Sequence, residues 1–363
     1  MQTKTGYSSN PDARQAVAEA ASGFSSPHGL LIMADYKRLP EISELLRERF
    51  PNTEMIGTSG TTYLNTKSSD KHLILVAFGS DAIVKAGIIR NLSSHPVTDI
   101  PVLKDKLREA GASRENSIVI EYCTNDEERL VTTIDVALSG TGVPLVGGSV
   151  FGYGANEVGR VTYNGETYTD ACAYLVIHNT SGKIRVYREN IYGPYHDTKH
   201  IVTKVDLATK EVTQLDGRPA AEVYSQELGI SRDRIIDNVL ANPFGRSVGR
   251  QIFISSQKEL SSNGGIKMFK RLNVNDTISV LKLLDYRSIN KETCRQISEE
   301  CGDISLMLSV NCIYRYLLFT KENTYGEILG NLASVGTSVG CIGGGEQFNN
   351  QHVNQTMVCA VFE

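Results

Sequence analysis

Short apolar runs alternate with amphipathic stretches along most of this chain. Residues 30–34 and 73–78 are continuous apolar runs that predict buried strands, whereas residues 39–50 place their apolar side chains on one face of a helix. The alanine-rich residues 13–21 predict a further helix, which ends at Gly23. Strands that are joined by helices predict sheets that are at least partly parallel.

One unit of this pattern recurs three times: an apolar strand, a helix, an apolar strand that ends in small residues, and a final strand. The copies span residues 30–78, 117–177 and 305–362. They share a pattern rather than identical residues, so the pattern alone leaves open whether the repeat is true internal symmetry. Short links such as residues 163–166 predict antiparallel hairpins. The predicted fold class is therefore α/β (mixed α+β), with mixed sheets covered by helices.

The stretch between the second and third copies follows a different pattern. Residues 201–215 alternate apolar and polar positions about a turn and predict a hairpin, and a helix is expected soon after it. A length of 363 residues fits two globular domains, and we place their boundary after this hairpin. The predicted parts are an N-terminal helical segment at 1–27, a first domain at 28–215 and a second domain at 216–363.

Charge and the lengths of the apolar runs exclude several classes of protein. Lysine and arginine number 37 against 41 aspartates and glutamates, so we expect no nucleic acid partner, which would favour a basic excess. The apolar runs of five or six residues are far shorter than the roughly 20 that span a bilayer, so we expect no membrane association. The polar start contains no secretory signal, and we expect a cytoplasmic protein. The seven cysteines contain no C-x-x-C pair and suggest neither a disulfide framework nor a zinc site.

The sequence lacks the common catalytic signatures of nucleotide hydrolases, zinc proteases, α/β-hydrolases and nicotinamide dehydrogenases. It has instead three glycine-rich strand ends, at residues 57–60, 147–154 and 340–347, where a ligand or another backbone can approach closely. The alternative is that these glycines only relieve turns or tight strand packing. The candidate ligand-binding residues at the first two ends are Gly57, Thr58, Ser59, Gly147, Gly148 and Ser149.

The densest polar cluster lies near the C-terminus. Gly345, Glu346, Gln347 and Asn354 offer donors and acceptors that suit an ammonium or amide group, so they join the candidate ligand-binding residues. We expect Glu346 to project from a strand end and to bind a cationic metabolite. The alternative is that it accepts hydrogen bonds from its own hairpin or pairs with Arg315.

Cys312 and Arg315 are the last two candidates, at a predicted strand end that enters a helix. A thiol there would have a lowered pKa, and the protein would then be an enzyme with Cys312 as nucleophile and Glu346 as acid or base. The alternative is a small packed side chain, since no partner histidine is identifiable. Of the seven histidines, only His196 and His200 have a metal-ligand spacing, in a stretch that resembles a loop, so no metal site is expected. A single histidine is still a candidate axial ligand for haem.

Several short motifs follow one another in order over nearly the whole chain. They are Gly57-Thr58-Ser59-Gly60, Gly147-Gly148-Ser149-Val150-Phe151-Gly152, Leu215-Asp216-Gly217-Arg218-Pro219-Ala220, Val223-Tyr224, Asn242-Pro243-Phe244-Gly245, Asn311-Cys312-Ile313-Tyr314-Arg315, Gly345-Glu346-Gln347 and Asn354-Gln355-Thr356. In their order and spacing the chain resembles the FIST sensory proteins, which carry a FIST N and a FIST C domain in tandem. The run Gly343-Gly344-Gly345 is more glycine-rich than the family pattern.

The resemblance implies an intracellular input module that binds a small molecule, with amino acids proposed. Such a module signals to a histidine kinase, a cyclic-dinucleotide enzyme or a chemoreceptor, and we expect that partner to be a separate chain. One branch resembles haem proteins that sense nitric oxide, so a haem cofactor is the alternative within the family. We therefore expect a sensor without enzymatic activity, with the enzyme that uses Cys312 as the competing hypothesis.

Overall fold

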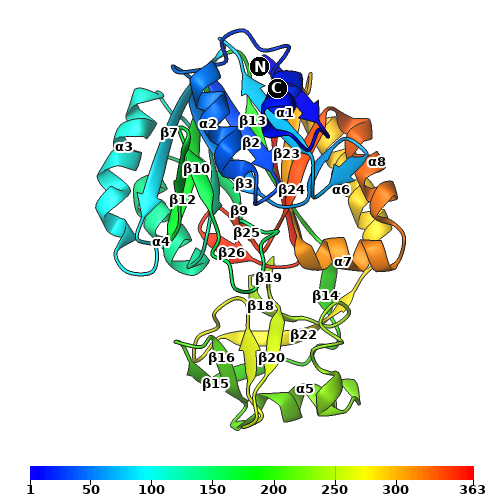
Figure 1. Ribbon diagram of the computed structural model, residues 1–363. Helices are drawn as coiled ribbons and strands as arrows, with labels where there is room; N and C mark the ends of the chain where they lie inside the picture. Colours follow the sequence, from blue (N-terminus) through cyan, green and yellow to red (C-terminus); the bar gives the residue numbers. More distant parts are fainter. Residues whose placement is uncertain (250) are drawn as a thin grey trace.

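The computed structural model describes residues 1–249 and 251–363. Over these residues it contains three six-stranded sheets and one sheet of nine strands. The six-stranded sheets form one large body with helices on the outside, and the fourth sheet belongs to a smaller subdomain next to it (Figure 1). The predicted class of mixed sheets covered by helices is confirmed.

The first sheet is built mainly from the first copy of the repeat, in the order β1-β6-β2-β3-β10-β11. Strands β2 and β3 are parallel, and the other pairs are antiparallel. The predicted first helix is capped by Asp12, whose carboxylate accepts a hydrogen bond from the Gln15 N–H at 2.9 Å. The elements are β1 (Thr3–Ser8), α1 (Ala13–Ala20), β2 (Gly29–Ala34), α2 (Leu39–Arg49), β3 (Glu54–Ser59), β6 (Leu73–Phe78), β10 (Val161–Tyr163) and β11 (Glu166–Tyr168).

The second sheet repeats this topology, in the order β7-β12-β8-β9-β25-β26. Its parallel pair is β8 with β9. Its elements are β7 (Ala82–Arg90), η1 (Pro96–Asp99), α3 (Ile100–Glu109), β8 (Ser117–Cys123), α4 (Glu127–Leu138), β9 (Leu145–Ser149), β12 (Ala171–Asn179), β25 (Glu346–Phe348) and β26 (Gln351–Val353).

The third sheet has the same order again, β13-β27-β23-β24-β4-β5, with β23 and β24 parallel. Its elements are β4 (Thr62–Leu64), β5 (Lys67–Ser69), β13 (Ile184–Asn190), α6 (Tyr286–Glu300), β23 (Leu306–Cys312), α7 (Ile313–Lys321), α8 (Tyr325–Val335), β24 (Ser338–Gly343) and β27 (Thr356–Phe362). The three copies are thus equivalent in topology, and the repeat is genuine internal symmetry.

Each copy lends a hairpin to the sheet of another copy. The hairpin β4–β5 follows β3 in the chain but pairs with β24 of the third sheet. The hairpin β10–β11 follows β9 but pairs with β3, and β25–β26 follows β24 but pairs with β9. The exchange closes a ring of three units, and it covers the edge that each parallel pair would otherwise leave open.

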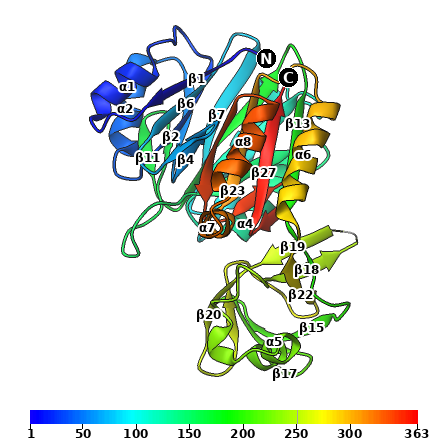
Figure 2. The ribbon, with the colours of Figure 1, turned by 90° about the vertical axis from the view of Figure 1, so that its right-hand side faces the viewer.

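The inner faces of the three sheets share one hydrophobic core. The outer face of each sheet packs on its own helices: α1 and α2 on the first, α3 and α4 on the second, and α6 and α8 on the third. Figure 2 shows α6 and α8 on the outside of β27 and β23. Central strands that are buried on both faces have continuous apolar sequences, which explains the apolar runs that predict these strands.

The subdomain is a single insertion into the third copy, between β13 and α6. It has its own hydrophobic core. Its β15–β16 hairpin and α5 match the hairpin and the helix that the sequence predicts, and the predicted domain boundary lies between them. Its elements are β14 (Tyr192–Pro194), β15 (His200–Asp206), β16 (Glu211–Leu215), β17 (Arg218–Pro219), α5 (Ala220–Leu228), η2 (Arg232–Arg234), β18 (Phe244–Val248), β19 (Gln251–Ser255), β20 (Gln257–Leu260), β21 (Ile266–Met268) and β22 (Thr277–Leu283).

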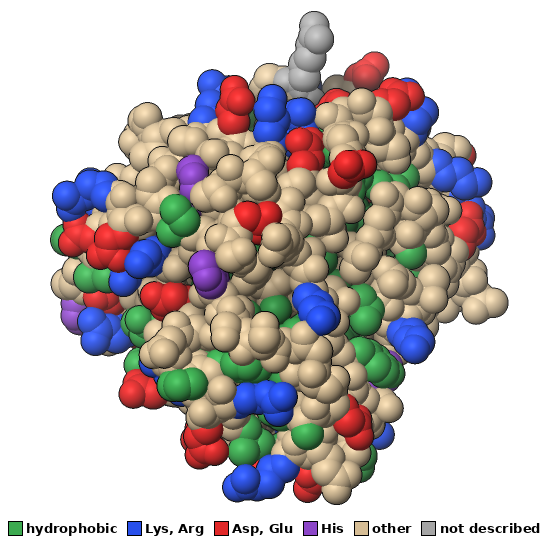
Figure 3. Space-filling view, turned by 90° about the horizontal axis from the view of Figure 1, so that it is seen from above, with side chains coloured by type: hydrophobic (Ala, Val, Ile, Leu, Met, Phe, Trp, Pro, Cys, Tyr) green, Lys and Arg blue, Asp and Glu red, His purple; other side chains and the backbone are tan. Residues whose placement is uncertain are grey.

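The surface carries both signs of charge. On the face seen in Figure 3, acidic and basic side chains lie interspersed, without a field of one sign. No helix in the described part of the chain has the length and apolar character needed to cross a membrane.

Candidate ligand-binding site

The three glycine-rich strand ends meet at one end of the ring. The Phe151 N–H donates to the Ser59 carbonyl at 3.1 Å, and the Gly344 N–H donates to the Ser149 carbonyl at 3.0 Å. The third and first units are joined in the same way, because the Ile342 N–H donates to the Thr61 carbonyl at 2.8 Å. The carboxyl ends of β3, β9 and β24 therefore converge, as expected for equivalent strands of a repeat.

Four candidate glycines serve this close packing. A Cβ atom added at Gly57, Gly147, Gly148 or Gly345 would lie 2.2 to 2.6 Å from an atom of a neighbouring side chain. Real Cβ atoms essentially never show such distances, so a larger residue at any of the four positions would force a neighbouring group to shift. The geometry at these four positions is that of the packing alternative. Their part in the site is to bring polar strand ends together.

Two crevices open between neighbouring units at the convergent strand ends. The first has a volume of about 580 Å³ and lies between the first and second units, with Asp35, Tyr36, Gly60 and Phe151 in its lining. Thr58 and Ser59 lie beside it in β3, both buried, outside that lining. The Ser59 hydroxyl donates to the Phe151 carbonyl at 2.9 Å, so it holds the crevice wall in place.

The second crevice has a volume of about 460 Å³ and lies where the second and third units meet the subdomain. It contains three of the candidate residues, Ser149, Cys312 and Asn354, together with side chains from α4, α7 and the subdomain. The lining consists of Thr124, Glu127, Ser149, Val150, Phe151, Tyr153, Gly154, Ala155, Ser256, Phe269, Cys312, Ile313, Tyr314, Gly344 and Asn354. It is the best candidate site, because it combines polar groups with four aromatic walls.

The polar groups of this crevice are fixed by hydrogen bonds. The Ser149 hydroxyl donates to Glu127 Oε1 at 3.0 Å, and Lys210 Nζ lies 3.7 Å from Glu127 Oε2. Asn354 Oδ1 accepts a hydrogen bond from the Ser256 N–H at 3.2 Å, which links the core to the subdomain. The crevice therefore presents a carboxylate held in one orientation, with an amide group on another wall.

Cys312 is the N-cap residue of α7, and its side chain makes no capping hydrogen bond within the described part of the chain. Ile313 and Tyr314, in the first turn of that helix, line the crevice with it, so the partly positive helix N-terminus faces the cavity. Burial, with the Glu346 carboxyl nearby, raises the pKa of the Cys312 thiol well above its ordinary value. The lowered pKa on which the enzyme hypothesis depends is therefore not found, since burial outweighs the helix N-terminus.

Arg315 points away from the crevice and is fully buried. Its guanidinium forms an ion pair with Glu189 of β13, and its Nε donates to Asn311 Oδ1 at 3.2 Å. The suggested pair between Arg315 and Glu346 is not formed, because Glu189 takes that place. Arg315 thus ties α7 to the third sheet.

Glu346 and Gln347 also lie behind the crevice wall and are fully buried. Glu346 Oε2 accepts hydrogen bonds from the Thr356 N–H at 3.1 Å and the Thr356 hydroxyl at 2.8 Å. Burial raises the pKa of Glu346 to about 8. Gln347 Nε2 donates to the Ser149 hydroxyl at 3.3 Å and lies 3.2 Å from His352 Nδ1. Glu346 has the geometry of a hairpin anchor, and Gln347 that of a support for Ser149.

Some lining residues were not singled out from the sequence. Glu127 is the first residue of α4 and lies four residues after the end of β8 at Cys123, so a polar helix start soon after a buried strand was an available signal. Tyr314 belongs to the motif at residues 311–315, in which the sequence singled out Cys312 and Arg315. Tyr153 and Phe269 carried no such signal, since Phe269 reaches the crevice only through the packing of the subdomain.

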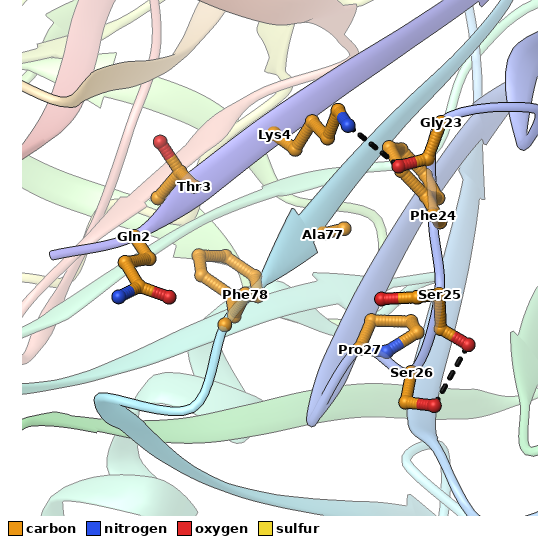
Figure 4. A pocket seen from close by; sticks show the side chains of 11 residues that line it. Gln2, Thr3, Lys4, Gly23, Phe24, Ser25, Ser26, Pro27, Ala77 and Phe78 are labelled. Atoms are coloured by element: carbon orange, nitrogen blue, oxygen red, sulfur yellow. Dashed lines mark hydrogen bonds between the residues drawn. The ribbon is translucent and has the colours of Figure 1, made fainter.

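Other features fit a ligand less well. A pocket of about 260 Å³ near the N-terminus, shown in Figure 4, lies between β1, the end of β6 and residues 23–27. Lys4 Nζ, its charged group, already donates to the Gly23 carbonyl at 2.6 Å. For haem, the described lining of the 460 Å³ crevice contains no histidine, so this crevice does not supply the histidine axial ligand that the sequence suggested.

Comparisons with known proteins agree with the motifs. The family model of the FIST N domain matches residues 28–218, and that of the FIST C domain matches residues 220–349. A comparison with curated proteins found no match. FIST domains are sensory, ligand-binding domains of signalling proteins. With the two models matching in tandem over most of its length, the chain belongs to the FIST family.

Proposed function

We propose that this protein senses a small zwitterionic metabolite of the amino acid class, bound in the 460 Å³ crevice. The observation that carries the proposal is that one crevice holds both the Glu127 carboxylate and the N-terminus of α7. A carboxylate binds an ammonium group through charge-assisted hydrogen bonds. A helix N-terminus favours a carboxylate, because its N–H groups point outwards and its dipole is positive there.

The aromatic walls suit the side chain of such a ligand. Phe151 and Tyr153 come from the second unit, Tyr314 from the third, and Phe269 from the subdomain. Phe269 and Tyr314 pack edge to face with their ring centres 5.7 Å apart, so they join the subdomain to α7. A ligand between these walls would contact the core and the subdomain together. We propose that this contact changes how the subdomain is held, and that a separate histidine kinase, cyclic-dinucleotide enzyme or chemoreceptor detects the change.

The test is a thermal-shift screen of the natural amino acids, followed by calorimetry on the best ligand. A ligand at 100 times its Kd stabilises the folded protein by about 2.7 kcal/mol, which is readily measured. Glu127→Gln should weaken binding by about ten-fold or more, because it removes the charge that pairs with the ammonium group. Glu44→Gln, an exposed glutamate on α2, is the matched control. The absence of any stabilising amino acid, or equal affinity in Glu127→Gln, would refute the proposal.

Catalysis by Cys312 is the competing hypothesis, and the crevice lining favours binding over it. A nucleophilic cysteine acts as the thiolate, whereas burial raises the pKa of this thiol. Cys312→Ala should therefore retain ligand affinity, and turnover of a bound metabolite that is lost in this variant would establish the enzyme instead. Haem binding stays a prediction of the family resemblance, and a visible absorption band after supply of haem would support it.

A further inference from the structure

A separate cavity lies on the side of the first turn of α4 away from the 460 Å³ crevice, and it is lined by basic side chains. It has a volume of about 510 Å³ and lies between α4, the β25–β26 hairpin and the subdomain, which adjoin each other in Figure 1. Its cationic lining residues are Arg129, Arg246, Lys270 and Arg271. Among the described residues, Glu128 is the one acidic side chain in that lining. The cavity therefore has an excess of positive charge.

Three nitrogen atoms of these side chains are buried without a partner. Lys270 Nζ, Arg246 Nε and Arg271 Nε have no hydrogen-bond acceptor among residues 1–249 and 251–363. The Lys270 side chain is deeply buried, since the residue is only 6% exposed. A buried ammonium group without an acceptor costs free energy, and buried cations in proteins are normally paired. Lys270 Nζ lies 5.4 Å from the centre of the Phe253 ring, and no hydrogen-bond acceptor pairs with it in the described part of the chain.

The acidic groups nearby do not supply such an acceptor. Glu128 already accepts hydrogen bonds from Lys210 Nζ at 2.9 Å and from the Arg271 N–H at 2.6 Å. Asp276 lies 3.3 Å from Arg246 Nη1 and leaves the Nε of that arginine free.

The electrostatics of Lys270 agree with this arrangement. Burial, together with Arg246 and Arg188, lowers the pKa of Lys270 to about 7, against the opposing effect of Glu128 and Asp276. A bound anion would raise that pKa again and restore the full charge of the ammonium group.

We propose that this cavity binds the phosphate group of a small phosphorylated metabolite. Arg and Lys side chains from α4 and the subdomain line one cavity, and their N–H groups suit the several oxygens of a phosphate. A volume of about 510 Å³ exceeds what a bare phosphate ion needs, so the ligand carries a further group. The donors of Arg246, Lys270 and Arg271 belong to the subdomain, whereas Arg129 belongs to α4, so the ligand bridges the subdomain and the core.

This site is distinct from the crevice that we propose for an amino acid, but the two are neighbours in the chain. Glu127 lines the crevice and Glu128 lines the phosphate cavity, and the same holds for Phe269 and Lys270. Either site can be tested without assuming the other.

The experiment is calorimetry on the full chain with two probes, inorganic phosphate and glycerol 3-phosphate, at an ionic strength matched with sodium chloride. Saturable binding is expected, with glycerol 3-phosphate at least as tight as phosphate. Lys270→Met and Arg271→Gln should each weaken binding by about ten-fold or more, since each removes a charged donor. Lys282→Met removes an exposed lysine of the same subdomain and should leave the affinity unchanged.

Three results would overturn the proposal: no saturable binding of either probe, binding that persists in both cavity variants, or equal weakening in the Lys282 control. Binding of inorganic phosphate alone would exclude the metabolite. In phosphate-free buffer Lys270→Met should melt at the same or a higher temperature than the natural protein, because it removes an unpaired buried charge. If that variant does not fold, Arg271→Gln carries the test.

Discussion

Replacing Glu346 by Gln separates a hairpin anchor from a ligand-binding group. The carboxyl is fully buried and holds Thr356 through two hydrogen bonds to one oxygen. With its pKa raised to about 8 by burial, the group is mostly protonated at neutral pH. Glutamine has nearly the shape of the protonated form, and its carbonyl oxygen can accept the same two hydrogen bonds. The substitution therefore preserves the anchor and removes only the titration.

The size of the effect follows from the two pKa values. The ordinary pKa of this carboxyl is 4.5 and the folded value is about 8. Because the folded pKa is raised, the contribution to stability is fully present below 4.5 and is lost as the pH rises through 8. One pKa unit corresponds to about 1.4 kcal/mol, so the loss between about pH 5 and pH 8 is on the order of 2 to 4 kcal/mol. Glu121 also has a pKa raised to about 8 by burial, but it is present in both proteins and cancels in their difference.

The assay is urea unfolding of the natural protein and the variant at about pH 5, 6.5 and 8. Relative to the natural protein, Glu346→Gln should gain about 2 to 4 kcal/mol of unfolding free energy over this range. Glu48→Gln, an exposed glutamate on α2, should follow the natural protein at every pH. A Glu346→Gln curve parallel to that of the natural protein would refute the argument, because the carboxyl would then be ionised in the folded state. If Glu346→Gln has the same pH dependence of unfolding free energy as the natural protein but a lower ligand affinity, Glu346 is a binding residue.

Three further predictions concern the packing behind the crevice. Arg315→Gln should lower the unfolding free energy by about 3 to 5 kcal/mol, because it leaves Glu189 buried without its partner, and a loss below about 1 kcal/mol in urea unfolding would contradict the buried pair. Gly147→Ala should cost about 1 to 3 kcal/mol or more in the same assay, since its Cβ would lie 2.2 Å from Glu121 Oε1, and an unchanged midpoint would contradict that packing. All seven cysteines are buried, and the pKa of Cys312 is raised, so a disulfide reagent at neutral pH should react with them only after a denaturant is added. Rapid reaction of Cys312 in the folded protein would instead support the enzyme hypothesis.

The sequence predicts the central strands of each unit because burial on both faces makes them continuous apolar runs. The runs 30–34, 73–78 and 117–122 correspond to β2, β6 and β8, and the helix at 39–50 corresponds to α2. The order of these elements showed a threefold pattern, and the equivalent strand orders of the three sheets establish that it is internal symmetry. The physical reason is that a strand between two packed layers has no polar face to interrupt the pattern.

The exchange of hairpins was beyond the sequence pattern. The strands β4, β10 and β25 have three residues each, so their local sequence does not specify which sheet they join. The contacts that decide it are distant in the chain: the Tyr63 hydroxyl of β4 lies 2.7 Å from the Ser309 hydroxyl of β23. The position of a three-residue strand is therefore determined by such tertiary contacts and not by its intrinsic β-propensity.

The role of Glu346 was open for a related reason. A glycine run before a glutamate allows the carboxylate to face a ligand, and it equally allows another strand to pack closely against the backbone. Both arrangements require residues without a side chain, which is glycine, at the same positions before Glu346. The two arrangements differ in the partner of the Glu346 carboxylate, which in the structure is Thr356. Thr356 is the first residue of β27 and follows the β25–β26 hairpin in the chain.

The subdomain explains why one strand-end crevice differs from its equivalent in the repeat. The first crevice, between the first and second units, is lined within the described chain by residues of the large body. The second crevice also receives Ser256 and Phe269, because the insertion between β13 and α6 places the subdomain against the ends of β8, β9 and β23. Internal symmetry thus makes all three glycine-rich strand ends resemble binding loops in the sequence, while the insertion gives one crevice an additional wall. A ligand in that crevice contacts two parts of the molecule at once, which is the arrangement that a sensor needs if binding is to alter how those parts are held.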